Sequence, residues 1–205
     1  MLRPTPWPFA LAILTFAGQT VADEAWHGDG LVDGVQVEHR AVAGSHFDEL
    51  RLSLVTTVSV EKLCAAIYPH ALSTKLERNF KKQELLRETA TERWTYEQIA
   101  VPVLSDRDYI VHTKVDVPAS TGQCEVSFAS VDDPSRPPVE GFVRIPVIRG
   151  HWNVFPLADG KVSVQYRIFS EPGGGVPAFL SRGGQRSTAV DFMKLILARA
   201  GHPAP

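Results

Sequence analysis

The stretch from 161 to 169 has the cleanest alternation of apolar and polar residues in the chain. Every second position is apolar, at Val162, Val164, Tyr166 and Ile168. Successive side chains of a strand point to opposite faces of a sheet, so this row predicts one buried face. The preceding Asp159-Gly160 pair is typical of a tight hairpin turn. This part of the chain is therefore constrained to an antiparallel sheet.

Shorter runs with the same period predict further strands. They cover residues 34–42, 47–57, 94–101, 123–130, 142–148 and 150–156. The first two are separated by the Gly44-Ser45 turn and form a predicted hairpin. The proline-rich loop 132–138 cannot lie inside a sheet, since proline has no backbone N–H to donate.

Two other stretches have helical spacing. Ser59 is a suitable cap for the row Val60, Leu63, Cys64 and Ile67. A second row lies within 178–200, at Phe179, Val190, Met193 and Leu197. The Gly183-Gly184 pair in that segment predicts a kink or a short first helix, since a helix-interior glycine costs about 1 kcal/mol. Residues 75–93 fit a helix or a strand, and their pattern slightly favours a helix. The predicted fold class is α+β, an antiparallel sheet with a long closing helix.

Arg107 stands at the head of an otherwise apolar row. The row continues through Tyr109, Val111, Thr113 and Val115 on the inward face of a predicted strand. A guanidinium rarely lies inside a protein without a polar partner, because its unpaired burial costs several kcal/mol. Alternatively, the strand begins at Asp108 and Arg107 faces water from a Ser-Asp turn. The residues support both interpretations equally.

The composition is that of one ordinary globular domain. The 205 residues are 44% hydrophobic and 21% charged, with a formal net charge of -2. A chain without a basic surface is a poor nucleic-acid binder, and we expect no such partner. The seven histidines are scattered without ligand spacing, which predicts no metal site, and we expect no cofactor.

Residues 1–22 resemble a secretory signal peptide. A cation at Arg3 is followed by an apolar run from Phe9 to Ala17 and by small residues up to Ala22. The run is much shorter than the roughly 20 residues of a membrane-spanning helix, which argues against an anchor. We expect export to the periplasm or the extracellular space, with residues 23–30 as an irregular lead.

The chain has two cysteines, Cys64 and Cys124. Both lie on apolar faces, and an oxidising compartment would allow them to pair. Sequence alone does not bring their Cα atoms within bridging distance, so two separate buried thiols are the favoured interpretation.

Several landmarks together resemble the START domain, the lipid-transfer family of the helix-grip (SRPBCC) superfamily. They are Asp33-Gly-Val-Gln-Val, Tyr96, Pro102-Val-Leu-Ser-Asp-Arg-Asp-Tyr109, Gly141-Phe-Val-Arg144, Gly150-His-Trp152 and Pro172-Gly-Gly-Gly-Val-Pro177. The resemblance spans residues 31–200 and leaves 201–205 as a tail. It implies a curved antiparallel sheet gripped by a long C-terminal helix around an internal cavity. It also implies that residues 75–93 lead into Trp94 as a strand and that Arg107 points inward.

The resemblance further implies an exported bacterial protein that binds a single lipid or sterol and carries it, as a monomer with transient membrane contact. The predicted ligand-binding residues are Trp94, Tyr96, Arg107, Tyr109, Phe142, Arg144, Trp152, Tyr166, Phe179 and Met193. For any single aromatic, ordinary core packing is the simpler interpretation. Gly173, Gly174 and Gly175 would form a mobile loop at the cavity mouth.

The alternative function is enzymatic, because the same superfamily includes polyketide cyclases and hydrolases. Acid–base candidates would be Asp106, Asp108, His112 and His151. No Gly-x-Ser-x-Gly motif or second carboxylate at a fitting spacing accompanies them, so structural roles are favoured and no catalytic residue is assigned. A protein-interaction module is a third class, and an exposed apolar patch without a cavity would indicate it.

Overall fold

Ten strands form one curved sheet in the part of the chain that the structure describes. The computed structural model describes residues 25–68, 80–101, 104–117, 122–176 and 178–202, without the side chains of 178–182. The strands are β1 (His27–Val32), β2 (Val35–Ala41), β3 (Asp48–Thr56), β4 (Phe80–Glu88), β5 (Glu92–Ile99), β6 (Asp106–Asp116), β7 (Cys124–Ser130), β8 (Phe142–Arg144), β9 (Val147–Pro156) and β10 (Val162–Glu171). A single 3₁₀ turn, Ala158–Gly160, links the last two.

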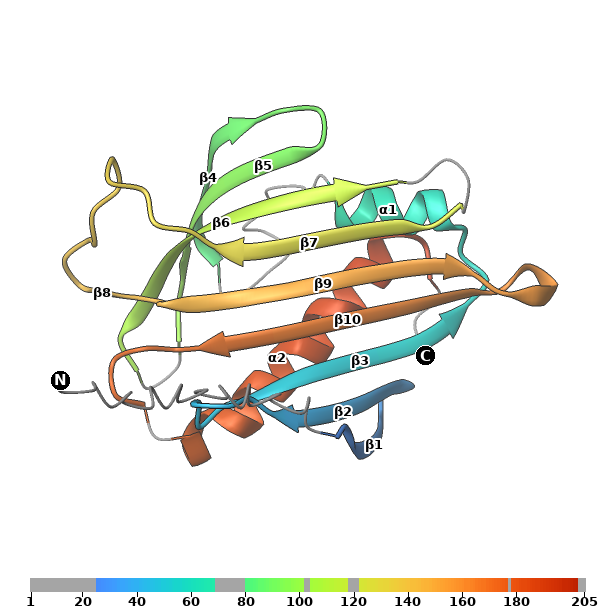
Figure 1. Cartoon of the computed structure of the whole chain (residues 1–205), viewed down its shortest axis with the longest axis horizontal. Coiled ribbons are helices and arrows are strands. Elements are labelled where there is room, and N and C mark those ends of the chain that lie inside the picture. The colour runs from blue at the N-terminus through green and yellow to red at the C-terminus, as the bar shows by residue number, and fades with distance from the viewer. Residues whose placement is uncertain (1–24, 69–79, 102–103, 118–121, 177, 203–205) are drawn as a thin grey trace, which may run out of the picture.

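The spatial order of the strands differs from their order in the chain (Figure 1). It runs β1-β2-β3-β10-β9-β7-β6-β5-β4, and the short β8 pairs with β6 in parallel while the other pairs are antiparallel. The first three strands form one meander and β4 to β7 form another. The hairpin β9–β10 lies between them, with β10 against β3 and β9 against β7.

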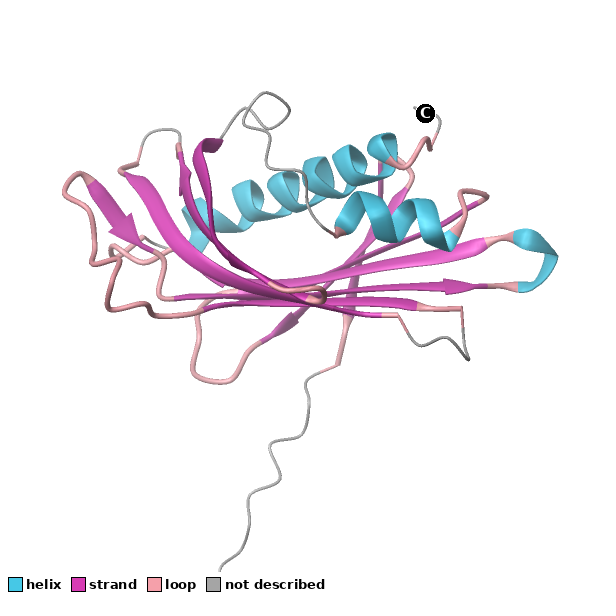
Figure 2. Ribbon diagram, turned by 90° about the horizontal axis from the view of Figure 1, so that it is seen from above, coloured by secondary structure: helices cyan, strands magenta, loops and turns pink. Residues whose placement is uncertain are grey.

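Both helices lie on one face of the sheet (Figure 2). Helix α1 (Val60–Ile67) begins at Ser59, whose hydroxyl accepts a hydrogen bond from the Lys62 N–H. Helix α2 (Ala178–Arg199) runs without interruption through the glycine pair. The expected short first helix is therefore wrong. Packing of the helix beyond residue 188 offsets the low helix propensity of the two glycines.

The core lies between α1, α2 and the larger part of the sheet. Its buried side chains include Val37 and Leu52 from the first meander, Val154 and Val164 from the central hairpin, and Leu63 from α1. Helix α2 contributes Ala189, Val190, Met193, Ile196 and Leu197. Met193, which we expected to contact a ligand, is fully buried in this core.

Three local expectations are corrected. Residues 27–32 form an edge strand paired with β2, where an irregular lead was expected. Residues 80–88 form β4, as the family resemblance implied and against the slight helical preference of the pattern. Cys64 and Cys124 form a disulfide with a Cα–Cα distance of 5.9 Å, because α1 packs directly against β7. The interpretation as two separate thiols is therefore wrong.

Candidate functional site

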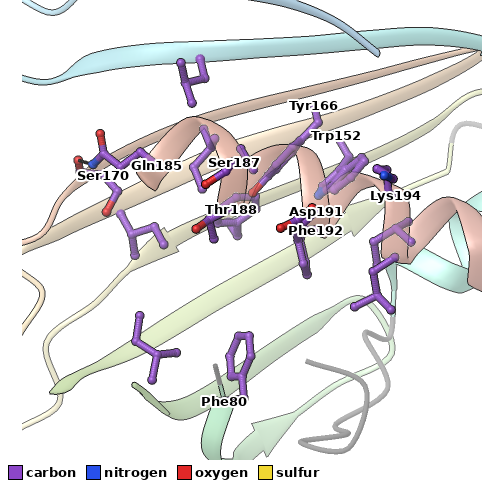
Figure 3. A pocket seen from close by; sticks show the side chains of 18 of the residues that line it. Phe80, Trp152, Tyr166, Ser170, Gln185, Ser187, Thr188, Asp191, Phe192 and Lys194 are labelled. Carbon is purple, nitrogen blue, oxygen red and sulfur yellow. Dashed lines mark hydrogen bonds between the residues drawn. The ribbon is translucent and has the colours of Figure 1, made fainter. Parts of the chain in front are cut away.

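A cavity of about 1350 Å³ lies between α2 and the concave face of the sheet. This volume exceeds the range of about 300–1,000 Å³ that is typical of small-molecule sites. In Figure 3, Thr188 and Phe192 of α2 lie on one side of the space, and Phe80 of β4 lies across from them. The sheet curves away from the helix here, so the two layers enclose a space that side chains do not fill.

One wall of the cavity is aromatic. Trp152 and Tyr166 stack with ring centroids 4.1 Å apart, and Phe192 lies at 6.1 and 5.8 Å from them. Phe128 lies 6.3 Å from Tyr166. All four side chains line the cavity, as does Tyr109. The predicted positions of Tyr109, Trp152 and Tyr166 on the concave face agree with the structure.

Arg107 points into the cavity, because β6 begins one residue earlier, at Asp106. It is only 2% exposed. Its guanidinium donates to the carbonyl oxygens of Pro172, at 3.2 Å, and Ser105. No carboxylate forms an ion pair with it among the described residues. Burial lowers the pKa of Arg107, and the nearby Asp106 carboxylate opposes that shift.

The Gly173–Gly175 loop packs beside Arg107. All three glycines have positive φ, and a Cβ atom added at Gly174 would lie 3.3 Å from Val143 and 3.6 Å from Nη2 of Arg107. The left-handed backbone and this close approach both require glycine. The loop therefore covers the end of the cavity where the buried cation lies, and its mobility remains a prediction.

Trp94 and Tyr96 lie on the opposite face of the sheet, and their prediction as cavity residues is wrong. The alternate residues of β5, Arg93, Thr95, Glu97 and Ile99, face the cavity instead. Trp94 stacks on His112 at 4.1 Å, and the Arg87 guanidinium lies 3.5 Å from its ring centroid. The Tyr96 hydroxyl donates to Asp108 at 3.0 Å.

Arg144 also belongs to the outer face. Its guanidinium donates two hydrogen bonds of 2.9 Å to the fully buried Asp108 carboxylate, and this interaction raises the pKa of Arg144. The pair joins β8 to β6, and Arg144 also donates to the carbonyl oxygens of Arg136 and Pro137 in the loop before β8. Phe142, at the start of β8, is not among the cavity-lining residues, and the side chain of Phe179 lies outside the described part of the chain.

Sequence reasoning missed a polar group on the cavity wall, formed by Gln83, Thr95, Glu97 and Thr113. The sequence analysis places Trp94 and Tyr96 on the inner face of the sheet. That orientation puts the alternate residues Thr95 and Glu97 on the outer face. The register across the hairpin could have corrected it. Ile99 pairs with Arg107, so an inward Arg107 requires inward Glu97 and Thr95.

The four acid–base candidates do not line the cavity. Asp106 pairs with Lys81, Asp108 with Arg144, and His112 with Trp94 and Glu92. His151 alternates with the inward Trp152 and points away. Within the described ranges, no group of three histidine, cysteine or acidic side chains could hold a metal ion.

The architecture is the helix-grip fold, and comparisons with known proteins agree. No family model matches the chain. An uncharacterized protein of Pseudomonas aeruginosa is 27% identical over 173 residues, which are 84% of each chain. A STAR-related lipid transfer protein from Xanthomonas axonopodis is 27% identical with a TM-score of 0.74, over 85% of this chain and 98% of that one. The chain therefore has the helix-grip fold of START domains and is similar to a STAR-related lipid transfer protein over most of its length.

More distant structures share the fold. Human StAR-related lipid transfer protein 5 has a TM-score of 0.75 at 19% identity, covering 89% of this chain and 88% of its own. The Zhui aromatase/cyclase of a Streptomyces species has a TM-score of 0.53 at 10% identity, covering 75% and 93%. The fold therefore occurs in proteins described as lipid transfer proteins and in one described as an aromatase/cyclase.

Proposed function

We propose that the chain binds one hydrophobic ligand, a lipid or sterol, in the cavity beneath α2 and carries it between membranes. The size of the cavity and its aromatic wall support this proposal. The Xanthomonas axonopodis protein and human StAR-related lipid transfer protein 5, with the same fold, are both described as lipid transfer proteins.

Arg107 is the observation that carries the proposal. The side chain is nearly inaccessible, yet its partners in the described structure are two carbonyl oxygens. Burying a cation without an opposite charge is costly, and the folded protein retains that cost in the absence of ligand. A polar or anionic ligand head beside Arg107 would offset it, while the apolar remainder of the ligand contacts the aromatic wall.

The place of action is part of the same proposal. Residues 1–22, the predicted signal peptide, lie outside the described residues. The Cys64–Cys124 disulfide fits an oxidising compartment such as the periplasm or the extracellular space. Among the helices of the described ranges, none is both long and apolar enough to cross a membrane. We propose a monomeric carrier that contacts membranes transiently.

Native mass spectrometry of residues 23–205 after incubation with a mixed lipid extract tests the proposal. We expect one bound lipid per chain, and fluorescent lipid exchange between vesicles should accelerate with protein concentration. A protein that binds no lipid from the extract would overturn the proposal.

The anchoring role of Arg107 has its own variant. A hydrogen bond to a charged group contributes about 1.5–3 kcal/mol, so Arg107→Leu should weaken binding roughly 10- to 100-fold. Arg149→Leu is the matched control, since Arg149 is exposed and alternates with inward residues of β9. Equal affinity in both variants would contradict the anchoring role.

A further inference from the structure

Strand β1 is an edge strand that is only weakly attached to the sheet. In the described sheet it pairs with β2 on one side, and a register shift between Gly28 and Gly30 interrupts that pairing. Leu31 is 72% exposed, so the strand buries little apolar surface. Segments with few buried contacts are the ones that open locally at a low cost in free energy.

Two ion pairs connect this edge to α2. Asp29 Oδ2 lies 3.4 Å from Nη1 of Arg186, whose Nη2 also donates to the Asp29 carbonyl oxygen at 3.1 Å. Nδ1 of His39 lies 3.1 Å from the other carboxylate oxygen of Asp29 and helps to fix its position. Nζ of Lys194 donates to Asp33 at 2.7 Å, and this hydrogen bond raises the pKa of Lys194. Arg186 and Lys194 stand roughly two helical turns apart, so both contacts lie on one side of α2. We call residues 27–33 the strap.

The first half of α2 depends on the strap more than the second half does. Among the side chains that the structure describes, those of α2 that belong to the core begin at Ala189. Residues 183–188 are exposed or half-buried, and the Gly183-Gly184 pair among them lowers helix propensity. Gln185 donates to the Ser170 carbonyl oxygen at 2.9 Å, and Figure 3 shows these two residues side by side. This half can therefore open while the second half stays packed.

The strap borders the cavity. Asp33 and Gly34 line it from the β1–β2 turn, and Lys194 lines it from α2. The side chains of Asp33 and Lys194 are also 55% and 37% exposed to solvent. Their ion pair therefore stands where the cavity meets solvent, and separating α2 from the strap would widen the cavity at this point.

The start of the strap is held on the other face of the sheet. The guanidinium groups of Arg40 and Arg51 lie 4.7 and 4.3 Å from the ring centroid of Trp26. Both arginines also form ion pairs on this outer face, with Glu49 and Glu38. Contacts of a cation with an indole ring are favourable. The strap would thus stay attached at Trp26 when it releases α2, and it could close again.

We propose that the strap holds the first half of α2 over the cavity and that the breaking of its two ion pairs sets the rate of ligand entry and exit. This inference rests on the proposed function and adds a control of the same cavity. Exposed ion pairs contribute little to global stability. Local opening costs far less free energy than unfolding, so the same small contribution changes the open population severalfold.

Hydrogen–deuterium exchange of the protein without added ligand tests the strap directly. The Asp29→Asn/Asp33→Asn double variant removes both carboxylates and keeps their shape, and asparagine tolerates the positive φ of Asp33. We expect the amides of residues 184–188 to exchange roughly threefold faster or more, and those of 193–199 to be unchanged. Equal exchange in variant and parent overturns the inference, as does equal acceleration along the whole helix.

Two further variants assign the effect to the ion pairs. Glu38→Gln is the matched control, because it removes the Arg51 pair between β2 and β3 and should leave the exchange of α2 unchanged. Lys194→Met breaks the Asp33 pair from the helix side and keeps an aliphatic stem. When it is combined with Asp33→Asn, it should add nothing to the effect of Asp33→Asn alone. Additive effects, or an equal effect of Glu38→Gln, overturn the inference.

Stopped-flow fluorescence with anilinonaphthalene sulfonate, a probe of apolar cavities, measures entry and exit. The Asp29→Asn/Asp33→Asn variant should raise both rates by one common factor of roughly three or more, with Kd changed less than about twofold, because a strap limits passage in both directions. Faster helix exchange with unchanged probe rates overturns the control of entry, while lipid binding stands. If neither the probe nor any extracted lipid binds, the proposed function fails, and the exchange data still decide whether the strap holds α2.

Discussion

Two groups of strands in the sheet differ in how closely their inner faces are packed. Beneath the helices, β2, β3, β9 and β10 present close-packed apolar rows to α1 and α2, and the core there is continuous. Beside the cavity, where β4, β5 and β6 lie, the buried cluster is smaller and consists of Tyr109 and Val111 of β6 with Ile145, which follows β8. We call these the core half and the cavity half. Their difference indicates that stability comes mainly from the core half, which also supplies the aromatic wall, while the cavity half supplies Arg107 and the less tightly packed wall of the cavity.

The largest effect should come from truncating a core side chain. Leu63 on α1 is fully buried, so Leu63→Ala should lower the free energy of unfolding by about 2–5 kcal/mol. Ile99→Ala, in the cavity wall, should cost less than about 1.5 kcal/mol because its side chain already borders empty space. Urea denaturation measures both. Equal losses would break the distinction between the two halves.

Removing the disulfide should have the next largest effect. The bridge closes a loop across a sequence separation of 60, and this loop contains β4, β5 and β6. The Cys64→Ala/Cys124→Ala double variant should lose about 2–4 kcal/mol, as is typical for a native disulfide. Limited proteolysis of this double variant should cut the cavity half first. Equal cleavage of both halves would contradict the distinction between them.

The two faces of β5 can be separated by a pair of small substitutions. Tyr96→Phe removes a buried hydroxyl that donates to Asp108 and should cost about 1–3 kcal/mol of stability. Ligand affinity should stay unchanged, since Tyr96 faces away from the cavity. Thr95→Val removes a buried hydroxyl that donates to Glu97 on the cavity wall, so it should change ligand affinity as well as stability. Thermal unfolding and calorimetric titration together decide whether the faces are independent.

The smallest effect concerns pH. Arg51 donates hydrogen bonds to Glu38 and lowers the pKa of its carboxyl group. A lowered folded-state pKa gives stability above the unfolded pKa of about 4.3, and that stability disappears as pH falls through the folded value. Glu38→Gln should therefore lower stability at pH 7 by up to about 1 kcal/mol and have no effect at strongly acidic pH. A constant difference across pH would contradict this assignment.

Much of the fold was predictable because period-two rows mark the strands on the core side. Val35, Val37, Leu50 and Leu52 alternate cleanly, and all four are buried. Strand β4 was harder to predict from the pattern, because charged residues stand on both of its faces. The family resemblance identified it where local pattern did not.

The site was less predictable, for a physical reason. Large aromatic side chains were expected to face inward, yet Tyr96 is buried on the outer face by Asp108 and its covering loop. The same expectation hid Glu97 and Thr95, since burying polar groups usually costs stability. The wall of a ligand cavity is an exception, because polar side chains can be buried there. Since Ile99 of β5 pairs with Arg107, the inward orientation of Arg107 predicts which face of β5 points into the cavity.

The order of strands has a consequence for how the chain acquires its structure. The two meanders share no strand pairing until β9 and β10 insert between them, and these are the last strands along the chain. Val162 must pair with Thr56, and Val154 must pair with Cys124, although long stretches of sequence separate the partners. Such pairings are slow to form. A chain ending before residue 147 would leave β3 and β7 as two unpaired edges, which are sites for aggregation. We therefore expect folding to begin only once synthesis is nearly complete.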